Sequence, residues 1–121
     1  MTIKTIEGIC DQLAYIPETE LLITDTQSAL DLMATVQYET GCTRIILNKE
    51  SICEDFFILS TCLAGEILQK YINYGIKLAI IGDYSIYTSK PLHDFIYECN
   101  HGKDFFFTSS LEEAKNYLSQ I

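Results

Sequence analysis

Residues 59–85, LSTCLAGEILQKYINYGIKLAIIGDYS, decide the fold of this chain. Apolar residues recur at helical spacing over residues 63–72, and Gly75 is of the residue type expected just after a helix. The unbroken apolar run over residues 76–81 predicts a strand that is buried on both faces. Gly82-Asp83 follows as a polar turn. The stretch therefore predicts one helix–strand unit of an α/β domain.

Two positions near the start of this helix carry more specific predictions. Ser60 or Thr61 is the predicted N-cap, because a hydroxyl there can accept a hydrogen bond from a backbone N–H of the first turn. Gly65 lies beside the apolar stripe, and this small residue predicts that the helix lies close to the sheet.

The rest of the chain repeats the same order on both sides of this stretch. Strands are expected over residues 3–6, 13–16, 43–47, 76–81 and 104–107, and helices over about 27–40, 61–74, 90–100 and 111–121. The first two strands are close enough in sequence to pair as a hairpin, and strands separated by helices pair in parallel through right-handed crossovers. The predicted fold class is α/β, in the order β-β-α-β-α-β-α-β-α. Residues 1–121 are expected to form a single domain, with one mixed sheet of about five strands and four helices.

Composition excludes several classes of partner. The chain has 121 residues, 48% of them hydrophobic, which is typical of one globular domain. Its net charge of −9 argues against nucleic acid and against an anionic membrane surface, because both are bound through Lys and Arg. No apolar run is long enough to span a membrane, and the polar N-terminus does not resemble a signal peptide. A cytoplasmic location is expected.

The five cysteines predict free thiols. Their number is odd, and no pair has C-x-x-C spacing, which favours a reducing compartment and argues against a zinc site. There is no glycine-rich phosphate loop of standard spacing, so neither a cofactor nor a metal is expected. A redox-sensing role for Cys62 or Cys53 is a separate hypothesis, which requires a thiol activated by its surroundings.

Polar residues gather where the parallel strands are expected to end. The carboxyl ends of such strands meet at one edge of the sheet, where α/β proteins bind their ligands. The candidate ligand-binding residues are Asn48, Glu50, Asp83, Tyr84 and Ser85. Asp83 at a strand end could bind a cation or accept a proton, with Glu50 as its candidate partner. The alternative is structural, because helices need caps and turns favour Asp and Ser.

A longer pattern resembles a known family. Residues 56–102 read FF-x-L-x-T-x-LAGEILQKY-x-NY-x-IKLAIIGDYS-x-Y-x-SK-x-L-x-DFIYE-x-N-x-G, which resembles a bacterial family named domain of unknown function family 4180. A weaker likeness extends from residue 30 to residue 114. The family has no known activity, so the resemblance implies none. The family pattern has glycine where this chain has Cys62, which weakens the case for this thiol as a family-wide nucleophile.

The order of elements is also similar to the STAS fold of anti-sigma-factor antagonists. Those proteins bind partner proteins, and a serine or threonine at the start of a helix is often phosphorylated. The matching position here is Ser60-Thr61, which makes these two residues possible phosphoacceptors, although the Asp-x-Ser-Gly-like motif of that family is absent. A phosphate there would lie near a helix N-terminus, which favours negative charge.

Two hypotheses on function follow. The favoured one is a STAS-like regulatory module that acts through contact with another protein, with a homodimer as a possibility. The alternative is a small-molecule-binding protein or enzyme that uses the polar edge of the sheet around Asp83. Interaction is favoured because the sequence presents no constellation of catalytic residues.

Overall fold

The computed structural model describes residues 1–7 and 12–119. In chain order the elements are β1 (Lys4–Glu7), β2 (Gln12–Ile16), α1 (Thr26–Thr40), β3 (Arg44–Asn48), α2 (Leu63–Asn73), β4 (Lys77–Ile81), α3 (Lys90–Asn100), β5 (Phe105–Thr108) and α4 (Leu111–Ser119). Three single turns of 3₁₀ helix join β3 to α2: η1 (Lys49–Ser51), η2 (Glu54–Phe57) and η3 (Leu59–Thr61). The described residues thus form the predicted five strands and four α-helices, in the predicted order.

The five strands form one mixed sheet in the order β1-β2-β3-β4-β5. β1 is antiparallel to β2, and each later pair is parallel, as between Ile46 of β3 and Ala79 of β4. The predicted hairpin and mixed sheet are therefore confirmed. Because spatial order follows chain order, right-handed crossovers place α1, α2 and α3 on one face and leave the other face to α4.

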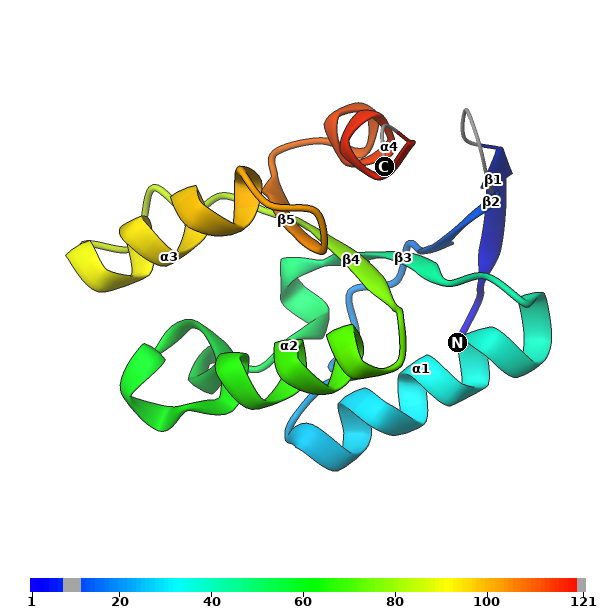
Figure 1. Cartoon of the computed structure of the whole chain (residues 1–121), viewed down its shortest axis with the longest axis horizontal. Helices are drawn as coiled ribbons and strands as arrows, with labels where there is room; N and C mark the ends of the chain where they lie inside the picture. Colours follow the sequence, from blue (N-terminus) through cyan, green and yellow to red (C-terminus); the bar gives the residue numbers. More distant parts are fainter. Residues whose placement is uncertain (8–11, 120–121) are drawn as a thin grey trace.

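The core is accordingly divided into two layers by the sheet (Figure 1). On one face Ile45, Leu78 and Phe105 pack with the buried side chains of α1, α2 and α3. On the other face the neighbouring strand residues pack against Ala114 and Leu118 of α4. This alternation follows from the period of two along a strand, and it explains why the central strands have no polar face.

The α1–α2 pair is closely packed. Tyr71 of α2 is fully buried, and its hydroxyl donates a 2.7 Å hydrogen bond to the backbone carbonyl of Ala29 in α1. Burial raises the pKa of Tyr71 far above its usual value of 10.0, so the phenol stays protonated and remains a donor. The hydrogen bond and the packing together hold α2 to both the sheet and α1.

α3 is held differently, mainly at its two ends. Ser89 is the N-cap and accepts a hydrogen bond from the N–H of Leu92, and Leu92 is the one residue of α3 that is fully buried. At the other end, the side-chain amide of Asn100 donates to the carbonyl of Phe107 at 3.1 Å and accepts from its N–H at 2.7 Å. Between these ends Phe95 is only half-buried.

The start of α2 differs from the prediction. Its N-cap is Cys62, whose φ of 65° is left-handed and whose side chain makes no capping hydrogen bond, so the prediction of Ser60 or Thr61 as the N-cap residue is wrong. The Thr61 hydroxyl nevertheless accepts a hydrogen bond from the N–H of Leu63, the first residue of α2, at 3.3 Å. Cys62 is both the C-cap of η3 and the N-cap of α2. The chain changes direction between the two helices at this residue, which requires its left-handed backbone conformation. Glycine adopts it without steric cost, which explains the glycine in the family pattern.

The prediction for Gly65 is also wrong. Gly65 is exposed on α2, and a Cβ added there would meet no atom within 4 Å. The residue therefore does not serve close packing of α2 on the sheet, which the buried residues Ala64, Ile67, Leu68 and Tyr71 provide instead.

Candidate functional site

The predicted polar edge exists, but its side chains are bonded to the chain itself. Asn48 at the end of β3 donates through its amide to the carbonyls of Pro17 at 2.9 Å and Glu18 at 3.4 Å. Ser51 donates to the same Glu18 carbonyl at 2.9 Å. These bonds anchor the segment after β2 to the segment after β3. Asn48 therefore serves as a connector between the two segments.

Asp83, Tyr84 and Ser85 form a self-contained turn after β4. The Asp83 carboxylate accepts hydrogen bonds from the N–H of Ser85 at 2.9 Å and from its hydroxyl at 2.6 Å, and these bonds lower the pKa of Asp83. The Tyr84 hydroxyl donates to the Ile80 carbonyl at 2.8 Å, and burial raises the pKa of Tyr84 strongly. The structural interpretation of the Gly82-Asp83 turn accounts for all of these contacts.

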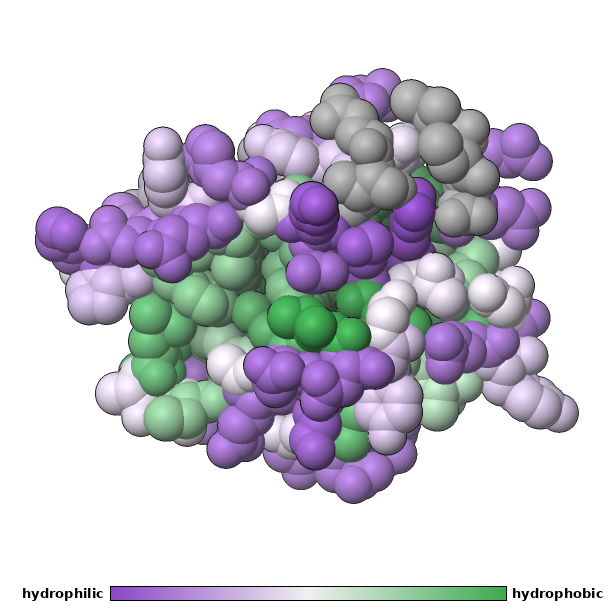
Figure 2. Space-filling view, viewed as in Figure 1, coloured by the Kyte–Doolittle hydropathy of each residue, from purple (hydrophilic) through white to green (hydrophobic). Residues whose placement is uncertain are grey.

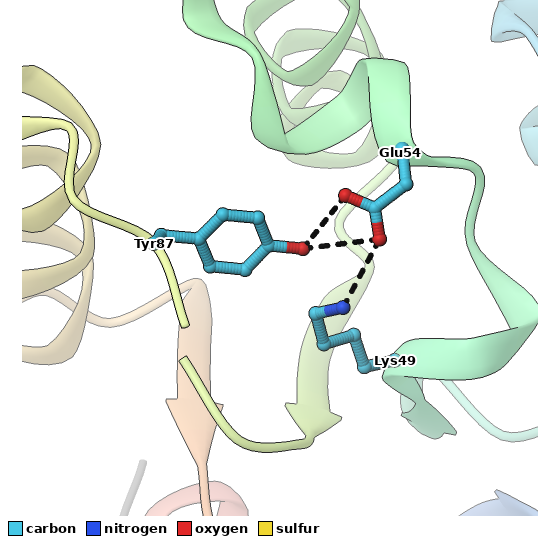
Figure 3. Close-up of polar contacts among 3 residues, drawn as sticks. All are labelled: Lys49, Glu54 and Tyr87. Atoms are coloured by element: carbon cyan, nitrogen blue, oxygen red, sulfur yellow. Dashed lines mark hydrogen bonds and ion pairs between the residues drawn. The ribbon is translucent and has the colours of Figure 1, made fainter. Parts of the chain in front are cut away.

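A three-residue contact crosses this edge and was not foreseen from the sequence (Figure 3). The ammonium of Lys49 lies 3.2 Å from the carboxylate of Glu54, and the hydroxyl of Tyr87 donates to the same carboxylate at 2.9 Å. Lys49 also lies over the ring of Phe57, 5.1 Å from its centroid, and 5.0 Å from that of Tyr87. We call Lys49, Glu54, Phe57 and Tyr87 the lysine–aromatic cluster. It joins the 3₁₀ turns to the loop before α3.

The electrostatics of this cluster argue against Lys49 or Tyr87 as a general base. Burial disfavours the Lys49 ammonium, but hydrogen bonds with Tyr87 and Glu54 outweigh that effect and raise the pKa of Lys49. Burial also raises the pKa of Tyr87. Both groups therefore keep their protons near neutral pH, so neither acts as a general base. Gly82 is needed beside this cluster, because a Cβ there would lie 2.6 Å from Cβ of Lys49.

Glu50, the remaining predicted ligand residue, is exposed on η1. Its negative charge contributes to the raised pKa of Tyr84, but no contact joins it to the Asp83 turn among the described residues. The structure thus brings the predicted residues to one edge without making them a convergent polar site.

The two possible phosphoacceptors differ in availability. The Thr61 hydroxyl donates to the carbonyls of Asp55 at 2.7 Å and Ile58 at 2.8 Å, and it accepts from the N–H of Leu63 at 3.3 Å. Ser60 is exposed, and its side chain makes no hydrogen bond within the part of the chain that the structure describes. Of the pair, Ser60 is therefore the residue whose hydroxyl is free to react.

The described cysteines are free thiols in contrasting settings. Cys42 is buried, Cys62 is exposed and Cys53 is half-buried, with its thiol 3.6 Å from the Thr24 carbonyl. Burial raises the pKa of Cys99 to about 11, which leaves this thiol protonated. No group of metal-ligating side chains occurs within residues 1–7 and 12–119, and Cys10 lies outside them. The redox hypothesis for Cys62 or Cys53 stays a prediction.

The structure adds a feature that the sequence prediction missed, a hollow of about 630 Å³ between α2 and α3. Phe95 of α3 lines one side, and the other side is lined by the first residue of α1, by the turn before α2 and by α2 itself, namely Thr26, Leu59, Cys62, Gly65, Glu66, Gln69 and Lys70. We call it the α2–α3 groove. Figure 2 shows apolar surface in the gap between the two helices, with hydrophilic residues on either side. The sequence signal that could have indicated this groove is Gly65, a glycine within a helix.

These features define an α/β fold with a polar edge that is largely hydrogen-bonded within the chain and an open apolar groove. The family model named "Domain of unknown function (DUF4180)" matches residues 10–118. The chain therefore belongs to this family, as its resemblance indicated. No curated protein and no solved structure matches the chain. Among the described residues, none of the helices combines the length and the apolar character that a membrane span requires.

Proposed function

We propose that this chain is a small STAS-like regulatory module of the cytoplasm that acts by binding another protein. One observation carries the proposal: most polar side chains at the sheet edge are already hydrogen-bonded within the chain, whereas the α2–α3 groove is apolar and open. A catalytic site needs polar groups that remain available to a substrate, whereas an interface needs exposed apolar surface. The β-β-α-β-α-β-α-β-α order supports the likeness to STAS proteins. The free thiols of the described residues agree with a reducing compartment.

Phosphorylation of Ser60 is the regulatory step in this proposal. Ser60 lies in η3, directly before α2, and lines a second hollow beside the groove, together with Leu59 and Ile86. A phosphoryl group there would add close to two negative charges to the surface that the partner contacts. Peptide mapping of the chain isolated from its own cells should locate phosphate on Ser60. Phosphate on Thr61 instead would contradict the assignment.

The function is tested by crosslinking the tagged chain in its own cells and quantifying what is recovered. An unrelated acidic α/β protein of similar size serves as the control. We expect a protein recovered in near-stoichiometric amount with this chain and not with the control, which then binds the purified chain directly.

The competing hypothesis, a ligand site around Asp83, is tested on the same sample by a thermal-shift screen against metabolites and nucleotides. The absence of a stoichiometric partner would overturn the proposal, and a compound whose stabilising effect is lost in Asp83→Ala would then favour the ligand site.

A further inference from the structure

The α2–α3 groove contains a glycine that its own chain does not explain. Glycine within a helix costs about 1 kcal/mol relative to alanine. At Gly65 the space above the backbone is open for at least 4 Å, so no internal packing offsets that cost. Because glycine has no side chain, the backbone of α2 is accessible at Gly65, and another molecule in the groove can approach α2 closely there.

The groove is longer than this first hollow. Leu59 lines both the 630 Å³ hollow along α2 and a second hollow of about 420 Å³ that lies between η2–η3 and the loop before α3. Ile58 and Ile86 line this second part and are 48% and 66% exposed. The two open hollows adjoin at Leu59 and together form one extended groove, which is largely apolar and carries the hydroxyls of Ser60, Thr88 and Ser89 in its second part. Such a shape suits an amphipathic helix with anchors at i, i+3 or i+4, and i+7 better than it suits a compact ligand, which needs enclosure.

The charge around the groove indicates which charge its occupant should carry. The bordering segments 54–70 and 86–98 contain five carboxylates and two lysines. Two of the carboxylates are paired, Glu54 with Lys49 and Asp94 with Lys90. The remaining charges are Asp55, Glu66 and Glu98 against Lys70. A second copy of the chain would bring the same net charge of −9 to this acidic border, which opposes self-association through the groove. Charge complementarity with the acidic excess that remains favours a basic occupant.

We infer that the α2–α3 groove binds an amphipathic helix of a partner protein, with apolar anchors in the groove and Lys or Arg along both flanks. This inference rests on the proposed function, because it assigns the surface and the partner chemistry of the same interaction. Gly65 lies where the backbone of α2 meets the bound helix, and Phe95 forms the opposite wall.

The test uses the full chain and a displayed library of helices of about four turns, with the apolar and flanking positions randomised. Enriched helices are expected to carry apolar anchors at helical spacing and basic flanks, and to bind more weakly at high salt. The matched variants are Gly65→Leu, which fills the groove, and Ala34→Leu, which adds the same kind of bulk at an exposed position of α1 that does not line the groove. Melting curves establish that both variants fold.

Gly65→Leu should weaken binding of the selected helices by about tenfold or more, equivalent to about 1.4 kcal/mol, whereas Ala34→Leu should leave it unchanged. Failure to enrich any helix, enrichment of acidic or uncharged helices, or wild-type affinity in Gly65→Leu would overturn the inference. So would a dimer that Gly65→Leu converts to monomer, because the occupant would then be a second copy.

The two proposals fail in different ways. A crosslinked partner that binds Gly65→Leu as tightly as the wild type refutes the groove but leaves the interaction function intact. If no stoichiometric partner is recovered, the proposed function itself fails.

Discussion

The α1–α2 pair and the α2–α3 pair lie on the same face of one sheet, yet they are joined in different ways. Between α1 and α2, the buried Tyr71 fills the contact and bonds to the Ala29 carbonyl. Between α2 and α3, the half-buried Phe95 and the bare Gly65 face a hollow of about 630 Å³. The comparison teaches that the first pair serves the stability of the fold, whereas the second leaves apolar surface open, where we propose that a partner binds.

Truncating an aromatic side chain in each pair tests this division most strongly. Tyr71→Ala should lower the free energy of unfolding by about 3–5 kcal/mol. The variant leaves a large cavity between α1 and α2 and removes the hydrogen bond to the Ala29 carbonyl. Phe95→Ala should lower the free energy of unfolding by only about 1–2 kcal/mol, since the Phe95 side chain is half-buried. Denaturant unfolding of both variants measures the difference. Equal losses would mean that the two pairs contribute alike to stability.

Alkaline pH should weaken the α1–α2 pair. Burial raises the pKa of Tyr71 above its usual value of 10.0, so above that pH the unfolded chain releases this proton while the folded chain retains it. The unfolded state then binds fewer protons, and stability should fall by about 1.4 kcal/mol per pH unit from this residue. Melting temperatures from pH 8 upward should fall less steeply in Tyr71→Phe than in the wild type.

Asn100→Ala tests how α3, which has little contact with α2, is held to the sheet. The variant removes two hydrogen bonds to Phe107 and leaves that residue's N–H and carbonyl to water, which should cost about 1–2 kcal/mol. Hydrogen exchange should rise in α3 and β5 and stay unchanged in α1 and α2. Uniform protection throughout the chain would show that α3 is held by other contacts.

Gly65→Ala should have the smallest effect on stability, and in the opposite direction. The added methyl group meets nothing within 4 Å, and alanine is the better helix former, so we expect a gain of about 0.5–1 kcal/mol. Unfolding measurements check the gain, and Ala34→Gly provides the reverse change on α1. A loss of stability in Gly65→Ala would mean that the chain itself uses the space above this glycine.

Hydrophobic periodicity was enough to predict the sheet and helices, because the strands around Ile46 and Ala79 are buried on both faces and leave little ambiguity. Local rules account for the geometry where one residue decides it, as at Ser89, which caps α3, and at Gly41, whose left-handed φ of 73° ends α1. They failed at the start of α2, where any of several hydroxyls could have served as the cap and the cap proved to be Cys62.

The candidate site was less predictable for a physical reason. The sequence places Asp83 and Asn48 at one sheet edge, but it does not reveal which nearby carbonyls and hydroxyls they bond to. The contact between Lys49 and Tyr87 joins residues from two separate loops, so no local pattern encodes it. The α2–α3 groove is likewise a gap between elements, and only the arrangement in space defines a gap.

The amide of Asn100 has a consequence for assembly in crowded solution. Residues of β5 bond alternately to β4 and outward, and Phe107 is one whose N–H and carbonyl point outward. Asn100 occupies both groups with one side chain, in the way that an additional strand would. An incoming strand from another molecule would have to displace this amide before it could pair there. The fold thus limits fibril-like growth at this end of the sheet without adding a charge or a proline to β5.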